Sequence, residues 1–313
     1  SSWHIFNYSE EDTSIYSGRF RKNLNLFHGT AIKYCDRNDI KSYNDNFIKK
    51  KIFDIINNLR IKIFKTFFVF ANSDKSFIPW ISWENNFPKN KCYKLIVSNL
   101  QRNIMVNNNQ QLDLDLFRTD EEKILFNQLK NLNKKIIGYF PTYRVGTKEL
   151  FIDINDEKKF EKLNSFLKEN NSMMVIKNHQ NSFIDDKNKH YDPKFDITNH
   201  LSKYENFLII GYNVDLTSIL PACDLVISDY SSCVIDFLFL DKAIILYTPD
   251  LESYSKSPGL ALNLKNQNFA YAVTNFDELE VLLEQYFKET SQFHNKHRST
   301  RAELKNKIFE ESD

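Results

Sequence analysis

Residues 224–250 constrain the fold of this chain more than any other segment. Two short apolar runs, Leu225–Ile227 and Ala243–Tyr247, have the composition of parallel strands that are buried on both faces. Between them lie a polar turn, Ser228–Ser232, and an apolar stretch, Cys233–Leu240, that is typical of a helix. The segment therefore predicts a strand, a turn, a helix and a second strand, which is the repeating unit of doubly wound α/β domains.

The same alternation runs through the second half of the chain. Further strands are predicted at residues 135–140, 172–177 and 207–210, and helices at 156–170, 215–222 and 276–289. Because helices between parallel strands cover both faces of a sheet, this order predicts a doubly wound parallel sheet with a binding site at the carboxyl ends of its strands.

The first half of the chain is less regular, with predicted strands at residues 24–27, 66–70 and 93–97. At 313 residues the chain is long enough for two medium domains. We predict a first Rossmann-like domain over residues 1–133 and a second over residues 134–290. A charged helix within residues 291–313 could cross back to the first domain.

Composition excludes several classes of function. The chain has 42 Lys and Arg residues against 41 Asp and Glu residues, so it lacks the overall positive charge of nucleic-acid-binding proteins. Its cysteines, Cys35, Cys92, Cys223 and Cys233, have no metal-ligand spacing. Cys223 and Cys233 lie in apolar segments and are predicted to be reduced, buried thiols of a cytoplasmic protein. No run approaches the ~20 apolar residues that span a bilayer.

The Ser228–Ser232 turn has two interpretations. Backbone N–H groups at the start of a helix attract anions, and the hydroxyls of Ser228, Ser231 and Ser232 add hydrogen-bond donors around Asp229. Alternatively, the serines are ordinary helix caps.

Polar residues follow two other predicted strands. His28, Gly29 and Thr30 come directly after residues 24–27, and a histidine pKa near neutrality suits a general base. Asp250 and Glu252 follow residues 243–247 and could accept hydrogen bonds from ribose hydroxyls. Each of these residues can also be an ordinary loop or capping residue.

Two more strand ends carry cations and donors. Thr142 and Arg144 follow residues 135–140, and an arginine can bind phosphate with two parallel hydrogen bonds. Lys177 and His179 leave the next strand two residues apart, hence on the same face, where both could donate to a diphosphate. For each pair alone, a polar surface loop is the alternative.

The order of these motifs resembles the CDP-glycerol glycerophosphotransferase family, which includes teichoic acid polymerases and related bacterial capsule polymerases. The resemblance covers about residues 24–264 and rests on HGT, SNLQRN, YFPTYR, KNHQ, ISDYSSCVIDFLFLDKAIILYTPDLESY and SPG. It implies a GT-B architecture of two Rossmann-like domains facing a cleft, with the opening strands of the first domain missing.

The resemblance also implies an activity. A polyol phosphate, from CDP-glycerol or CDP-ribitol, would be transferred to a hydroxyl of a cell-surface glycan or lipid-linked polymer, with release of CMP. His28 corresponds to the general base, whereas His179, Ser231 and Ser232 correspond to residues that hold the donor diphosphate. The implied reaction requires no cofactor, leaves a divalent metal open and involves no nucleic acid.

This sequence departs from the family pattern at three positions. Arg102 and Asn103 match part of a Pro-Arg-Asn-Asp motif, but Gln101 and Ile104 replace its flanking residues. Gln180 stands where the family usually has proline. A GT-B glycosyltransferase that uses a nucleotide sugar, or a non-catalytic binding domain of a larger polymerase, are therefore the alternatives.

Residues 47–68 mix large apolar side chains with six cations. A basic amphipathic helix can lie on an anionic membrane, which would make the protein peripheral on the inner face of the cytoplasmic membrane. Packing of the same helix on the first domain is the alternative.

Overall fold

The structure is a computed structural model, and it describes residues 3–6, 22–25, 66–70, 92–94, 105–106, 117–142, 156–177, 201–211, 213–255 and 268–309. Contacts divide the chain into two compact units. One contains Ser1–Val97, Glu252–Leu264 and Lys305–Asp313, and the other contains Ser98–Leu251 and Lys265–Leu304.

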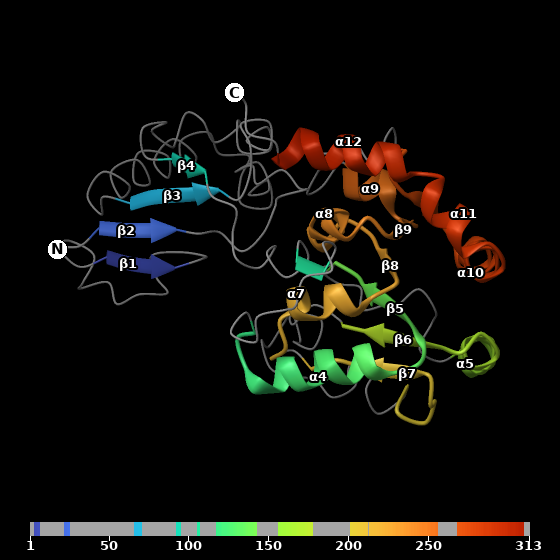
Figure 1. Ribbon diagram of the computed structural model, residues 1–313. Coiled ribbons are helices and arrows are strands. Elements are labelled where there is room, and N and C mark those ends of the chain that lie inside the picture. Colours follow the sequence, from blue (N-terminus) through green and yellow to red (C-terminus); the bar gives the residue numbers. More distant parts are fainter. Residues whose placement is uncertain are drawn as a thin grey trace, which may run out of the picture. The chain divides into compact units, whose positions relative to one another are not determined.

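The first unit is built on a parallel sheet of four strands in sequence order (Figure 1). Its strands are β1 (Trp3–Phe6), β2 (Lys22–Asn25), β3 (Thr66–Phe70) and β4 (Cys92–Lys94). The strand β1 was not predicted from the sequence, and β2 begins two residues before its predicted position. Leu24 of β2 pairs with Ile5 on one side and with Phe67 on the other, which fixes the register.

The second unit contains a six-stranded parallel sheet in the order β10-β9-β8-β5-β6-β7. Its strands are β5 (Lys135–Phe140), β6 (Ser172–Ile176), β7 (Phe207–Ile209), β8 (Leu225–Ser228), β9 (Ala243–Tyr247) and β10 (Tyr271–Val273). The chain first builds β5, β6 and β7 outward, and then returns to the other side of β5 to add β8, β9 and β10. All strands predicted from residue 135 to residue 247 are confirmed to within one residue, whereas β10 was not predicted.

The helices described in this half of the chain range from 4 to 13 residues in length. They are α4 (Asp120–Asn131), α5 (Glu157–Glu169), α7 (Leu216–Ile219) with the 3₁₀ turn η9 (Leu220–Ala222), α8 (Cys233–Phe237) with η10 (Leu238–Leu240), α9 (Leu251–Tyr254), α10 (Phe276–Lys288), α11 (Thr290–Asn295) and α12 (Arg298–Phe309). Side-chain oxygens of Thr119, Asp156 and Asn275 cap the starts of α4, α5 and α10. The helix predicted near the C-terminus is divided into α11 and α12.

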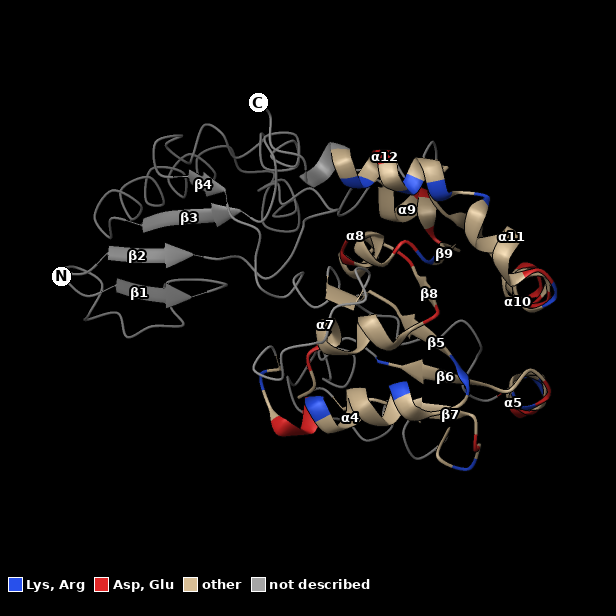
Figure 2. Ribbon diagram, in the orientation of Figure 1, with Lys and Arg blue, Asp and Glu red and all other residues tan. Residues whose placement is uncertain are grey.

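Both faces of the six-stranded sheet are buried. Leu225 and Ile227 of β8 pack in a core cluster with side chains of α5 and α10, and Val226 between them, which points to the opposite face, is also fully buried. Lys135 is the one charged residue within these six strands. Figure 2 accordingly shows the arrows of these strands almost entirely in tan, the colour of uncharged residues. Near-continuous apolar strands are what a doubly covered parallel sheet requires.

The helix α4 belongs to the second unit, although the sequence places it at the end of a first domain. Its Glu122 side chain is fully buried and accepts hydrogen bonds from the backbone N–H of Asp215 (2.8 Å), the backbone N–H of Arg118 (3.0 Å) and the hydroxyl of Ser218 (3.0 Å). A buried carboxylate needs such partners, so these bonds hold α4 against α7. The predicted boundary at residue 133 therefore differs from the division found by contacts.

Candidate functional site

The candidate site lies where the strand order of the six-stranded sheet reverses. The neighbours β5 and β8 pair in register, with Phe140 opposite Ser228. After β5 the chain turns to β6 on one side, whereas the segment from β8 onward builds the other side. The loops beyond such a pair of strands diverge and leave a crevice at their carboxyl ends, where α/β sheets bind ligands. Thr142 and the Ser228–Ser232 turn follow these two strands.

Asp229 joins the two strand ends. Its Oδ1 and Oδ2 atoms accept from the backbone N–H of Thr142 at 2.9 and 3.1 Å, and Oδ1 also accepts from the backbone N–H of Tyr230 at 2.5 Å. The Asp229 side chain is only 3% exposed. These contacts position the turn, and the predicted contact of Asp229 with a donor stays a prediction.

The serines of the turn differ in their surroundings. Ser228 is 1% exposed, and its hydroxyl donates to the carbonyl oxygen of Phe140 at 2.5 Å and lies 3.6 Å from the sulfur of Cys233. Ser231 and Ser232 are partly exposed, and the Ser231 Oγ accepts weakly, at 3.5 Å, from the backbone N–H of Cys233. Ser232 occupies the N-cap position of α8, but its side chain makes no capping bond. The capping interpretation therefore has little support at Ser232, and Ser228 is a buried structural contact.

Cys233 is a buried free thiol, as is Cys223, which confirms the sequence prediction for these two residues. Burial raises the pKa of Cys233 to about 12. A thiol that stays protonated at neutral pH is a poor nucleophile, so the thiol contributes packing to the turn.

Lys177 follows β6 and reaches toward the next loop. Its ammonium group donates to the carbonyl oxygen of Gly211 at 2.9 Å, and its backbone N–H donates to the carbonyl oxygen of Tyr139 at 3.2 Å. Burial lowers the pKa of Lys177. The structure thus places Lys177 after β6, which is separated by β5 from the strand β8 that leads into the turn.

Asp250 and Glu252 lie beyond β9, on the other side of β8. The Oδ1 atom of Asp250 accepts from the hydroxyl of Tyr230 at 3.0 Å. Glu252 is exposed in α9. Tyr230 was not singled out from the sequence, although a large aromatic residue inside a polar turn is a signal that this position is buried.

Asp236 lies in the block of sequence that carries the family resemblance, but it was not predicted to be a site residue. It is buried in α8 at 4% exposure, and burial together with the charge of Asp215 raises its pKa to about 7. The available signal was a single carboxyl group within the apolar run CVIDFLFL.

Seven predicted site residues lie outside the described part of the chain, and their roles stay predictions. They are His28, Gly29, Thr30, Arg102, Asn103, Arg144 and His179. Among the described residues, no group of three or more His, Cys, Asp or Glu side chains is arranged to hold a metal ion. No helix in the described ranges has the length and apolar character needed to cross a membrane.

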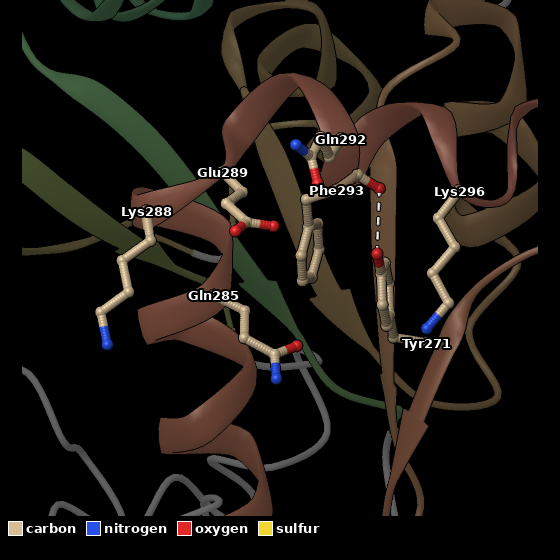
Figure 3. A pocket seen from close by; sticks show the side chains of 7 residues that line it. All are labelled: Tyr271, Gln285, Lys288, Glu289, Gln292, Phe293 and Lys296. Carbon is tan, nitrogen blue, oxygen red and sulfur yellow. Dashed lines mark hydrogen bonds between the residues drawn. The ribbon is translucent and has the colours of Figure 1, made fainter.

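A separate pocket of about 510 Å³ lies at α10, α11 and β10 (Figure 3). Its lining consists of Tyr271, Gln285, Lys288, Glu289, Gln292, Phe293 and Lys296. The rings of Tyr271 and Phe293 stack at 3.8 Å, and the Tyr271 hydroxyl donates to the carbonyl oxygen of Phe293 at 3.2 Å. Because Tyr271 is the first residue of β10, this pocket lies at the amino end of the sheet and is distinct from the candidate site.

Comparison with known proteins places these features in a family. The model of the CDP-Glycerol:Poly(glycerophosphate) glycerophosphotransferase family matches residues 2–310. The chain belongs to this family. The family that the motifs resemble is thereby confirmed.

Individual proteins that are similar to this chain include a teichoic acid primase and a teichoic acid polymerase. A teichoic acid glycerol-phosphate primase of Bacillus spizizenii is 46% identical over 48 residues, which are 15% of this chain and 12% of the primase. A variant of the wall teichoic acid polymerase TagF soaked for 30 minutes with CDPG has a TM-score of 0.64 at 19% identity, covering 96% of this chain and 67% of that chain. A second structure of a TagF variant has a TM-score of 0.68 at 17% identity, covering 99% of this chain and 68% of that chain.

The likeness to TagF shows the fold, and it confirms the α/β, GT-B fold class predicted from the sequence. This chain spans about two thirds of the TagF chains, and its match to the primase covers a small part of that enzyme.

Proposed function

We propose that this protein transfers a polyol phosphate from a CDP-polyol to a hydroxyl group of a glycan or polymer and releases CMP. The observation that carries the proposal is the Ser228–Ser232 turn at the strand-order reversal, in a chain that matches the glycerophosphotransferase family over residues 2–310. A TagF structure of the same fold was obtained with CDPG, which supports a CDP-linked donor.

The donor diphosphate would lie against the turn. Ser231 and Ser232 are partly exposed there, and Asp229 fixes the backbone that carries them. When the acceptor oxygen attacks the β-phosphorus, the bond between that phosphorus and the bridging oxygen breaks, and CMP leaves with the bridging oxygen. Negative charge builds on the phosphoryl oxygens, and removing one fixed donor to such a charge typically costs about 10²–10³ in rate.

The roles of the two histidines in the reaction are proposed from the family resemblance. His28 would take the proton of the acceptor hydroxyl, and His179 would hold the diphosphate, though both lie outside the described residues. His28→Ala should abolish CMP release while leaving affinity for the donor nearly intact. His179→Ala should instead weaken donor binding or donor reaction. CMP release at the wild-type rate from His28→Ala would refute the base assignment.

A donor screen tests the activity itself. The protein would be incubated with CDP-glycerol, CDP-ribitol and a set of sugar nucleotides, in the presence of a polyol-phosphate acceptor, and the products followed by phosphorus NMR. CMP release from a CDP-polyol alone would support the proposal and identify the polyol. Turnover of a sugar nucleotide would favour a glycosyltransferase, whereas donor binding without turnover would favour a non-catalytic domain.

Membrane association is a second part of the proposal. The basic segment 47–68 overlaps β3 from Thr66 onward, so an amphipathic helix would have to end before that residue. We expect the protein to float with vesicles containing anionic lipid at low salt and to be released as salt screens the attraction. Equal flotation with neutral vesicles, or none with anionic vesicles, would contradict this.

A further inference from the structure

We infer that Tyr230 is a positioning residue that couples the diphosphate turn to Asp250, so that the phosphate and ribose parts of a CDP-linked donor are recognised together. The inference rests on the proposed function for its ligand. The inference goes beyond the proposed function by assigning a role to Tyr230 and by making Asp250 the acceptor of hydrogen bonds from the ribose hydroxyls.

The geometry is a chain of three contacts across three strand ends. Asp229 accepts from the backbone N–H of Thr142, beyond β5, and from the backbone N–H of Tyr230, beyond β8. The hydroxyl of Tyr230 then donates to Asp250, beyond β9, at 3.0 Å. Neighbouring parallel strands are about 4.8 Å apart, so the ends of β5, β8 and β9, which these contacts connect, together span roughly the length of a nucleoside diphosphate.

The burial of Tyr230 shows why its hydroxyl matters. The side chain is 0% exposed, although it lies between four polar residues of the turn. A phenylalanine would fill the same volume without bringing a polar atom into the interior, where an unpaired hydroxyl is costly. The hydroxyl of Tyr230 is paired with a carboxylate, and a bond to a charged acceptor is the stronger kind.

The Asp250 carboxylate, which Tyr230 orients, has the chemistry to accept hydrogen bonds from a ligand. It is half-buried at the carboxyl end of β9, and a carboxylate accepts several hydrogen bonds at once. The bond from Tyr230 therefore orients the carboxylate. Ribose presents two neighbouring hydroxyl donors, which a single oriented carboxylate can accept.

The test measures affinity for CDP and for its 2′,3′-dideoxy analogue by calorimetry. In wild-type protein the analogue should bind about tenfold more weakly than CDP, because it lacks the hydroxyls that donate to the carboxylate. Tyr230→Phe should weaken CDP binding about 3- to 10-fold, the range of one hydrogen bond, and leave affinity for the analogue unchanged. In steady-state assays the KM for the CDP-polyol should rise while kcat changes little.

Tyr271→Phe is the matched control. Tyr271 is also buried, and its hydroxyl also donates one bond, to the carbonyl oxygen of Phe293, but at the amino end of the sheet. This variant loses a comparable contact, so it should leave both affinities unchanged.

Asp250→Asn provides a second variant in case Tyr230→Phe folds poorly. It should lose affinity for CDP but not for the analogue, and the double variant should bind CDP no more weakly than Asp250→Asn alone, because the two residues act as a unit. Equal loss for both ligands, or no loss, in either variant would overturn the inference while the proposed function stands. Failure of wild-type protein to bind CDP would overturn both.

Discussion

Replacement of Asp229 by asparagine tests whether one carboxylate joins the ends of β5 and β8. Asparagine keeps the shape of the side chain but removes its charge and replaces one oxygen by an NH₂ group. Both oxygens of Asp229 face the N–H of Thr142, at 2.9 and 3.1 Å, so the NH₂ group of asparagine would face this donor in either of its two positions. The bond to the N–H of Tyr230 would persist only as a neutral one.

The magnitude follows from these two donors. A hydrogen bond to a charged group contributes about 1.5–3 kcal/mol and a neutral one about 0.5–1.5 kcal/mol, so each weakened bond costs about 1–1.5 kcal/mol. Removing a charge from a site that is 3% exposed recovers part of its desolvation cost. We therefore expect Asp229→Asn to lower the free energy of unfolding by about 2 kcal/mol.

Urea denaturation measures this change as a lower midpoint at an unchanged slope. Asp277→Asn is the control, because Asp277 is an exposed carboxylate in the first turn of α10, where loss of charge should cost under about 1 kcal/mol. If Asp229→Asn destabilises the protein no more than this control does, the carboxylate does not join the strand ends and the explanation of the turn is wrong.

Three other predictions concern the scaffold of the site. Glu122→Gln, which turns one buried acceptor into a donor facing donors, should cost about 2–4 kcal/mol in urea denaturation and release α4 from α7; an unchanged midpoint would contradict this. Gly138→Ala would place a methyl group against the ring of Phe140 in the core, so thermal denaturation should show a loss of about 1–3 kcal/mol rather than the gain usual when glycine in an element becomes alanine. Neutral His294 accepts from the backbone N–H of Ala243 at 2.9 Å, and burial and nearby cations lower its pKa from 6.5. Its contribution to stability is therefore complete above pH 6.5 and is lost as the pH falls below that value; unfolding at pH 7.5 and 5.5 should show this loss in wild-type protein and a smaller one in His294→Gln.

The second sheet was predictable from sequence because its strands are continuous apolar runs. The bounds of β5 and β9 match their predicted residues, since burial on both faces leaves little choice of composition. The three-residue strand β10 and the four-residue strand β1 were missed, because such short segments acquire their structure from the neighbour they pair with. The register of β2 likewise depends on β1 and β3, whose residues are distant in sequence.

The candidate site was predictable to the level of the turn but not of individual side chains. The hydroxyls of Ser228 and Ser231 are chemically plausible phosphate ligands, and Asp229 was predicted to contact the donor, yet Ser228 is buried against Phe140 and Asp229 binds the backbone of Thr142. These partners are 87 and 88 residues away in sequence, so no local pattern reveals them. The likeness of the turn to a family motif pointed to this candidate site, and only tertiary contacts separate its buried residues from those that are partly exposed.

The strand order has a mechanical consequence. The segments β5-β6-β7 and β8-β9-β10 are each continuous in the chain, and within the six-stranded sheet they are hydrogen-bonded to one another only through the β5–β8 pair. That pair therefore joins the two halves of the sheet, and the hydrogen bond between Asp229 and Thr142 connects them again just beyond the carboxyl end of the pair. A ligand bound beside this contact would stabilise the junction between the two halves of the sheet. Ligand binding would therefore raise the stability of the sheet, and a more stable junction would favour ligand binding.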